Sequence, residues 1–111
     1  MVSESIRQRF LRDPLKVRLG NLASDLARIA SFSENPENYE VVVSVLEEAK
    51  CFVRWAASEE SHEKQSLLTD IQRLVSEWER GWLAGCPVST MHDEAIRKSK
   101  ELLVIAGYEY E

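Results

Sequence analysis

The sequence YEVVVSVLEEAKCFVRWAA, residues 39–57, is the most apolar stretch of the chain and decides the fold. On a helix that turns by about 100° per residue, its apolar side chains fill one arc of roughly 160°. The arc comprises Tyr39, Val41, Val42, Val45, Leu46, Ala49, Phe52, Val53, Ala56 and Ala57. Because one neighbour cannot cover so wide an arc, we expect this helix to contact at least two others.

A strand is the alternative for the beginning of this stretch, because three consecutive valines have high strand propensity. No other segment of the chain is available to pair with such a strand. The apolar positions also continue in helical register as far as Ala57. We therefore predict a helix.

Prolines, glycines and helical periodicity divide the rest of the chain. We predict a short helix over about residues 3–12 and further helices over about 14–33, 36–58, 62–84 and 90–106. Connections of about four to six residues imply that consecutive helices are antiparallel neighbours. The predicted fold is all-α, an up-and-down four-helix bundle preceded by a short N-terminal helix, and residues 1–111 form a single domain.

Polar residues in front of the helices are expected to cap them. The predicted caps are Ser3, Asp13, Asn35, Ser61 and either Ser89 or Thr90. Gly85 suits a left-handed C-terminal cap. Gly20, inside the second helix, is expected to mark the close approach of another backbone, and residues 108–111 are expected to form a loose acidic tail.

The net charge of −5 argues against a general nucleic-acid binder, because phosphate binding requires clustered positive charge. No apolar run approaches the roughly 20 residues that span a bilayer, so no membrane partner is expected. The N-terminus lacks an apolar stretch after a basic start and does not resemble a secretory signal. We expect a cytoplasmic protein.

The positive charge is concentrated near the N-terminus. Residues 1–20 carry a charge of +3 and residues 21–111 carry −8. The basic arm is expected to fold back on the acidic end of its own bundle or on that of a partner chain.

The cysteines and histidines do not predict a disulfide or a metal site. Cys51 lies about 15 residues into its helix, roughly 20 Å from the end that holds Cys86, whereas a disulfide needs Cα atoms within about 7 Å. His62 and His92 are predicted at opposite ends of the bundle. We expect free thiols, no metal and no cofactor.

Cys86 and His92 are the only candidates for catalysis. A thiolate would be favoured by an imidazole and by a nearby helix N-terminus. A histidine at the edge of an apolar arc is more often a packing residue, and the sequence suggests no oxyanion donor or cleft. A cysteine-dependent enzyme is therefore the third hypothesis.

Trp55 and Val43 lie outside the main apolar arc of their helix. Ile6 and Phe10 form a small apolar face on the N-terminal helix. A tryptophan in this position is covered by the N-terminal arm, covered by another subunit, or exposed. These four residues are the candidate interaction surface of the first hypothesis, a noncatalytic protein–protein interaction module that forms a homodimer.

The alternative hypothesis is a regulatory bundle that binds a small ligand between its helices. Its candidate pocket residues are Trp78, Trp82, His92 and Ser99. The two tryptophans fall in the middle of an apolar arc, where packing in the core is the more common role.

Overall fold

The computed structural model describes residues 3–57 and 62–108, and in these ranges it is all-α with no strand. The helices are α1 (Glu4–Arg12), α2 (Leu15–Phe32), α3 (Tyr39–Ala57), α4 (His62–Leu83) and α5 (Met91–Ile105), with a single 3₁₀ turn, η1 (Pro36–Asn38), before α3. The predicted boundaries agree with these to within one or two residues, except that η1 occupies the predicted start of the third helix.

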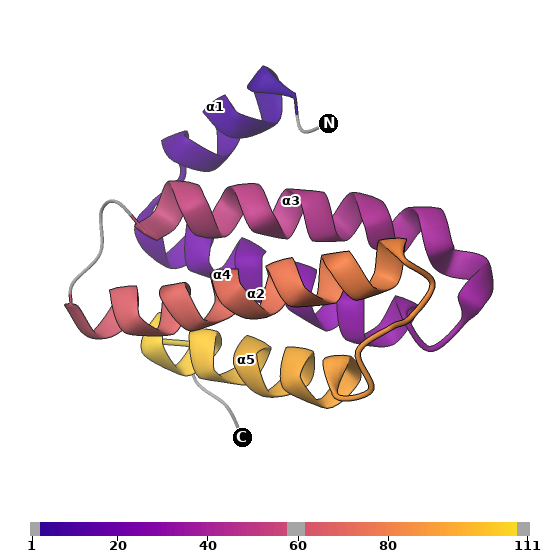
Figure 1. Cartoon of the computed structure of the whole chain (residues 1–111). Coiled ribbons are helices and arrows are strands. Elements are labelled where there is room, and N and C mark those ends of the chain that lie inside the picture. Colours follow the sequence, from indigo (N-terminus) through magenta and orange to yellow (C-terminus); the bar gives the residue numbers. More distant parts are fainter. Residues whose placement is uncertain (1–2, 58–61, 109–111) are drawn as a thin grey trace.

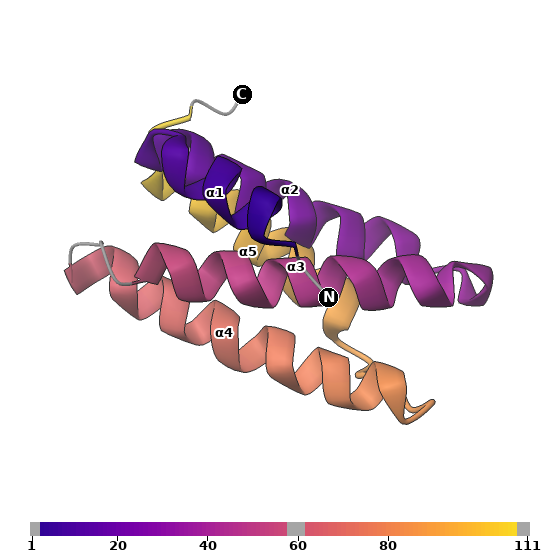
Figure 2. The same cartoon turned by 90° about the horizontal axis from the view of Figure 1, so that it is seen from above.

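Helices α2 to α5 form an up-and-down four-helix bundle, and α1 lies over α2 and α3 (Figure 1). The connections α2–α3 and α4–α5 lie at one end of the bundle. The α1–α2 junction and the end of α5 lie at the other (Figure 1). Helix α2 packs against α3 and α5, and α3 packs against α4 (Figure 2). Among the pairs of neighbouring helices in the bundle, α4 and α5 have the smallest contact, so the bundle is least closed between them.

The valine-rich segment is helical throughout, as predicted, and its middle part is the core of the bundle. The buried side chains of α3 are Val42, Val45, Leu46, Ala49, Phe52, Val53 and Ala56. Tyr39 and Val41 were expected in the same arc, but both are exposed at the start of the helix. The first turn of α3 extends to the end of the bundle, where it is covered on one side only: the Tyr39 ring stacks on Trp82, with ring centroids 5.8 Å apart.

The predicted caps are only partly observed. The Ser3 hydroxyl accepts a hydrogen bond from the Ile6 amide, and the Asn35 side chain caps η1. The prediction for Asp13 is wrong, because Pro14 occupies the N-cap position of α2 and no side chain caps it. The carbonyl of Asp13 instead accepts a hydrogen bond from Arg18 Nε at 3.0 Å.

Thr90 and Gly85 are two other predicted caps that lie in the described residues. Thr90 is at the N-cap position of α5, but its hydroxyl donates to Glu94 Oε1 at 2.8 Å instead of capping the backbone. Ser61 lies outside the described residues. Gly85 has a φ of +77°, as expected for a left-handed cap.

Gly20 marks a close approach, but of a side chain and not of a backbone. A Cβ at this position would lie 2.8 Å from Tyr108 Oη, and that hydroxyl donates to the carbonyl of Lys16 at 3.1 Å. The expected loose tail therefore has an ordered first residue, and residues 109–111 lie outside the described part. The close backbone approach occurs instead at Gly81, where a Cβ would lie 2.7 Å from the carbonyl oxygen of Cys86.

None of the helices in the described part of the chain combines the length and the apolar content that a crossing of the bilayer requires.

Candidate functional site

The outward side of α5 carries an open apolar hollow. Helix α5 buries Met91, Ala95, Ser99 and Leu102 against the bundle. On the side turned away from α2 it leaves Val104 64% exposed. The hollow on this side has a volume of about 740 Å³ and is lined by Leu67, Asp93, Ile96, Arg97, Lys100, Glu101, Val104 and Ile105. We call this set the α5 outer face.

The α5 outer face has an apolar floor and a charged rim of mixed sign. Asp93 and Glu101 are the acidic members of the rim, and Arg97 and Lys100 are the basic ones. Glu101 pairs with Lys98 at 3.0 Å, whereas Arg97 and Lys100 make no ion pair with any described residue. Apolar side chains inside a polar rim are typical of protein–protein interfaces.

The four predicted pocket residues do not form one site. Trp78 is fully buried and its Nε1 donates to Glu94 Oε1 at 3.3 Å. Trp82 Nε1 donates to the carbonyl of Tyr39 at 3.1 Å. Both indole N–H groups are thus satisfied within the protein and serve to join helices.

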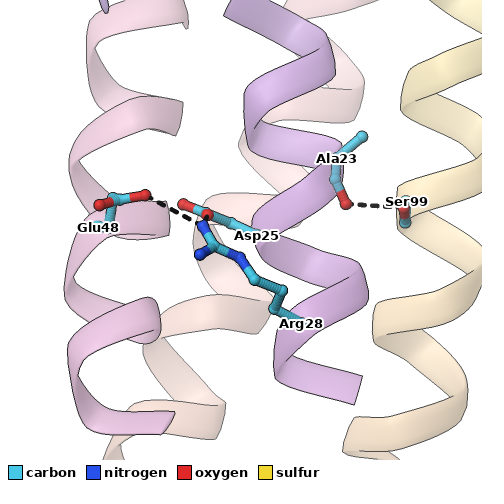
Figure 3. A network of polar contacts seen from close by, with 5 residues as sticks. All are labelled: Ala23, Asp25, Arg28, Glu48 and Ser99. Carbon is cyan, nitrogen blue, oxygen red and sulfur yellow. Dashed lines mark hydrogen bonds and ion pairs between the residues drawn. The ribbon is translucent and has the colours of Figure 1, made fainter. Parts of the chain in front are cut away.

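His92 and Ser99 lie together at the α2–α5 interface, away from the tryptophans. The Ser99 hydroxyl donates to the carbonyl of Ala23 at 2.8 Å (Figure 3). His92 Nδ1 lies 2.8 Å from the carbonyl of Ala30 and 3.0 Å from Glu34 Oε1. Both residues line a shallow hollow of about 330 Å³, but the Ser99 hydroxyl and His92 Nδ1 already contact groups of α2 and of the connection that follows it.

Cys86 and His92 are not brought together. The Cys86 side chain is exposed on the connection between α4 and α5, and Cys51 is half-buried. The imidazole of His92 faces Ala30 and Glu34, and no hydrogen bond links it to Cys86 in the described ranges. Those ranges also hold no group of three or more potential metal ligands.

The N-terminal helix covers the tryptophan that the sequence left open. Phe10 is only 2% exposed, and its ring stacks on Phe52 with centroids 4.3 Å apart. The Trp55 ring lies 5.7 Å from that of Phe10. Ile6 and Val43 are half-buried against the core. Of the three alternatives for Trp55, the structure thus shows partial cover by the chain's own arm.

A buried carboxyl group between α2 and α3 was not anticipated. Asp25 is 0% exposed, and Arg28 donates to its Oδ1. Arg28 also reaches Glu48 Oε1 of α3, at 3.4 Å (Figure 3). Asp25 Oδ2 is buried and accepts no hydrogen bond from any described residue. We call Asp25, Glu48 and Arg28 the carboxyl cluster.

The environment of Asp25 changes its acidity. Burial, followed by the charge of Glu48, raises the pKa of Asp25 from 3.8 to about 8, although Arg28 opposes both effects. The sequence carried one signal for this site: Asp25 lies within roughly 40° of Ile29 on the helical wheel, at the margin of the buried stripe.

Comparison of the chain with protein-family models, curated proteins and solved structures found no match. The fold and the two sites therefore define the class only as a helical bundle.

Proposed function

We propose that this protein is a noncatalytic protein–protein interaction module that forms a homodimer through the α5 outer face. The observation that carries the proposal is the contrast within α5. One side of this helix is fully packed on the bundle, and the other presents apolar side chains to an open hollow of about 740 Å³. Association would remove this apolar surface from water.

The arrangement of charges on α5 supports a second copy as the occupant. In a two-fold dimer the same surface meets itself, so each contact occurs twice. Placing the axis between Lys100 and Glu101, with the two α5 helices antiparallel, sets Lys100 of each chain against Glu101 of the other. The same register sets Ile96 against Ile105, and lays the aliphatic part of Arg97 over Val104.

This register brings opposite charges and apolar side chains together without pairing like charges. The partner is thus a protein surface of mixed charge. A polyanion is disfavoured, because the net charge of the chain is −5. The two free cysteines, Cys51 and Cys86, support a reducing compartment, and the proposal accordingly locates the protein in the cytoplasm.

Light scattering and sedimentation over a range of concentrations test the proposal. Val104→Arg places the new cation opposite Arg97 of the other chain, and we expect at least a tenfold rise in the dimer dissociation constant, equivalent to about 1.4 kcal/mol. Val41→Arg is the matched control, because Val41 is an exposed valine of α3 outside this face. A wild-type chain that stays monomeric at millimolar concentration would refute the proposal.

A charge swap tests the register. Lys100→Glu and Glu101→Lys each create like-charge pairs across the axis and should weaken the dimer. The double variant restores opposite charges, so it should recover most of the wild-type association. If the double variant is as weak as the sum of the two single changes, then Lys100 and Glu101 do not face each other in the dimer.

A further inference from the structure

The carboxyl cluster holds two acidic groups and one base at the α2–α3 interface. In Figure 3 the carboxyl groups of Asp25 and Glu48 point toward one another, and Arg28 lies beside both. The guanidinium bonds Asp25 through Oδ1 alone, which leaves Oδ2 buried without a donor. Arg28 itself is about half exposed, so its charge is partly screened by solvent.

Two ionised carboxylates are an unfavourable state for this arrangement. A buried carboxylate oxygen without a hydrogen-bond donor costs free energy, and a second negative charge beside it adds repulsion. A proton on Asp25 Oδ2 removes both costs. The protonated oxygen becomes a donor to Glu48, while Oδ1 continues to accept from Arg28.

We infer that Asp25 and Glu48 form a proton-binding site, in which a single proton held on Asp25 Oδ2 is shared with Glu48 and joins α2 to α3. The neutral Asp25, the anionic Glu48 and the cationic Arg28 together carry no net charge. Loss of the proton leaves a net charge of −1 and an unpaired anionic oxygen in the interface.

The site is connected to α1 through a hollow of about 250 Å³. The charged residues on the α1 side of this hollow are Arg9 of α1 and Asp13, which follows α1, and α2 and α3 contribute the cluster itself. On the opposite side of α2, α5 presents the hydroxyl of Ser99, which does not titrate in this range.

The proton therefore affects how the N-terminal helix α1 packs on α2 and α3. Phe52 of α3 lines the same hollow as Asp25 and Glu48, and the ring of Phe10 stacks on Phe52. When the proton leaves, repulsion between Asp25 and Glu48 separates the surfaces of α2 and α3 on which α1 rests. Trp55 reports this change, because its ring lies 5.7 Å from that of Phe10.

The position of the titration follows from the surroundings of the acid. Burial and the charge of Glu48 raise the pKa of Asp25 to about 8, so the site is mostly protonated at neutral pH and releases its proton as the pH rises through that value.

Carboxyl-carbon NMR of the wild-type chain is the direct test. We expect Asp25 to titrate near pH 8. Infrared spectroscopy at neutral pH should show the C=O stretch of a protonated carboxylic acid, and this band should be absent in Asp25→Asn. An Asp25 resonance that titrates near its ordinary value of 3.8, or an unchanged infrared band in the variant, would overturn the inference.

Two variants test whether the proton is shared. Asp25→Asn retains an N–H donor for Glu48 and an oxygen acceptor for Arg28, so the melting temperature and the Trp55 fluorescence should lose their dependence on pH near pH 8. Glu48→Gln removes the neighbouring charge and should weaken proton binding by Asp25 roughly tenfold. Asp70→Asn, at an exposed position of α4, is the matched control and should behave as the wild type. If Asp25→Asn and Asp70→Asn respond to pH alike, the shared proton is excluded.

Discussion

Helix α5 carries apolar side chains on two faces, and the two faces have different surroundings. Leu102 of the inner face is fully buried against the bundle, whereas Val104, two residues later, is 64% exposed. The α2–α3 interface shows the opposite exception to the usual pattern of burial. It buries the acidic residue Asp25 at a position where an apolar residue is expected. The buried Asp25 is thus compensated by Arg28 and by a proton. The α5 outer face is left open because the bundle is least closed between α4 and α5.

The largest expected effect is a difference in stability between substitutions on the inner and on the outer face of α5. Leu102→Ala removes fully buried atoms and leaves a cavity, so we expect a loss of about 2 to 5 kcal/mol in the free energy of unfolding. Val104→Ala should change the unfolding of the monomer by no more than about 0.5 kcal/mol. Urea denaturation at low protein concentration measures both values. Equal losses would show that the outer face is packed in solution.

The next largest effect concerns the pH dependence of the α2–α3 interface. The folded chain holds the Asp25 proton with a pKa of about 8, against 3.8 as the ordinary value. Between these limits the folded state binds more protons than the unfolded state, so stability is lost as the pH rises through this window. At about 1.4 kcal/mol per pKa unit, the full linkage value for this shift would be about 6 kcal/mol. We expect a smaller loss, on the order of 2 kcal/mol, because the site relaxes.

Urea unfolding at a series of pH values measures this loss, and subtraction of the same series for Asp25→Asn isolates it from other titrating groups. A difference between the two series that does not change with pH would mean that the interface buries no extra proton.

Arg28→Gln should have a smaller effect on the same interface. The guanidinium favours the ionised form of Asp25, so its removal costs most above the pKa of Asp25 and less at acidic pH. Because Arg28 is about half exposed, we expect about 1 kcal/mol at alkaline pH. Thermal unfolding of the variant at the two pH extremes provides the measurement. A larger cost at acidic pH would contradict the assignment of the proton to Asp25.

The smallest expected effect concerns Tyr108, which lies beyond the C-terminal end of α5 and packs on α2. Tyr108→Phe removes the hydrogen bond to the carbonyl of Lys16, and we expect a loss of about 0.5 kcal/mol because the bond is exposed to solvent. Gly20→Ala should be better tolerated in this variant than in the wild type, since the new Cβ would otherwise meet Tyr108 Oη. A double-mutant cycle measures the coupling, and strict additivity would show that the two residues do not touch.

Helical periodicity was sufficient to predict the fold, because the wide apolar arc of α3 requires several helical neighbours. Periodicity identifies which face of a helix is buried, but not which side chain of the next helix lies opposite. The pairing of Asp25 with Glu48 depends on the relative register of α2 and α3, so the carboxyl cluster could not be predicted. The contact between Phe10 and Phe52 depends in the same way on where α1 folds back.

The candidate surface was also only partly predictable. Helical periodicity places Ile96 and Ile105 on different flanks of α5. It could not indicate that α4 contacts α5 over a small area, because the separation of two helices follows from the packing of the whole core. The sequence favoured a packing role for His92 over that of a base, but it could not indicate the contacts of its Nδ1 with Ala30 and Glu34, which depend on how α5 lies against the end of α2.

The different exposure of the two cysteines makes the native chain suitable for site-selective spectroscopy. Cys86 is exposed and Cys51 is half-buried, so a maleimide spin label added in limiting amount modifies the connection between α4 and α5 first. In a two-fold dimer each molecule then carries one label at an equivalent position. Pulsed electron paramagnetic resonance reports the distance between the two labels without any engineered cysteine, and the geometry of self-association can be measured on the unaltered sequence.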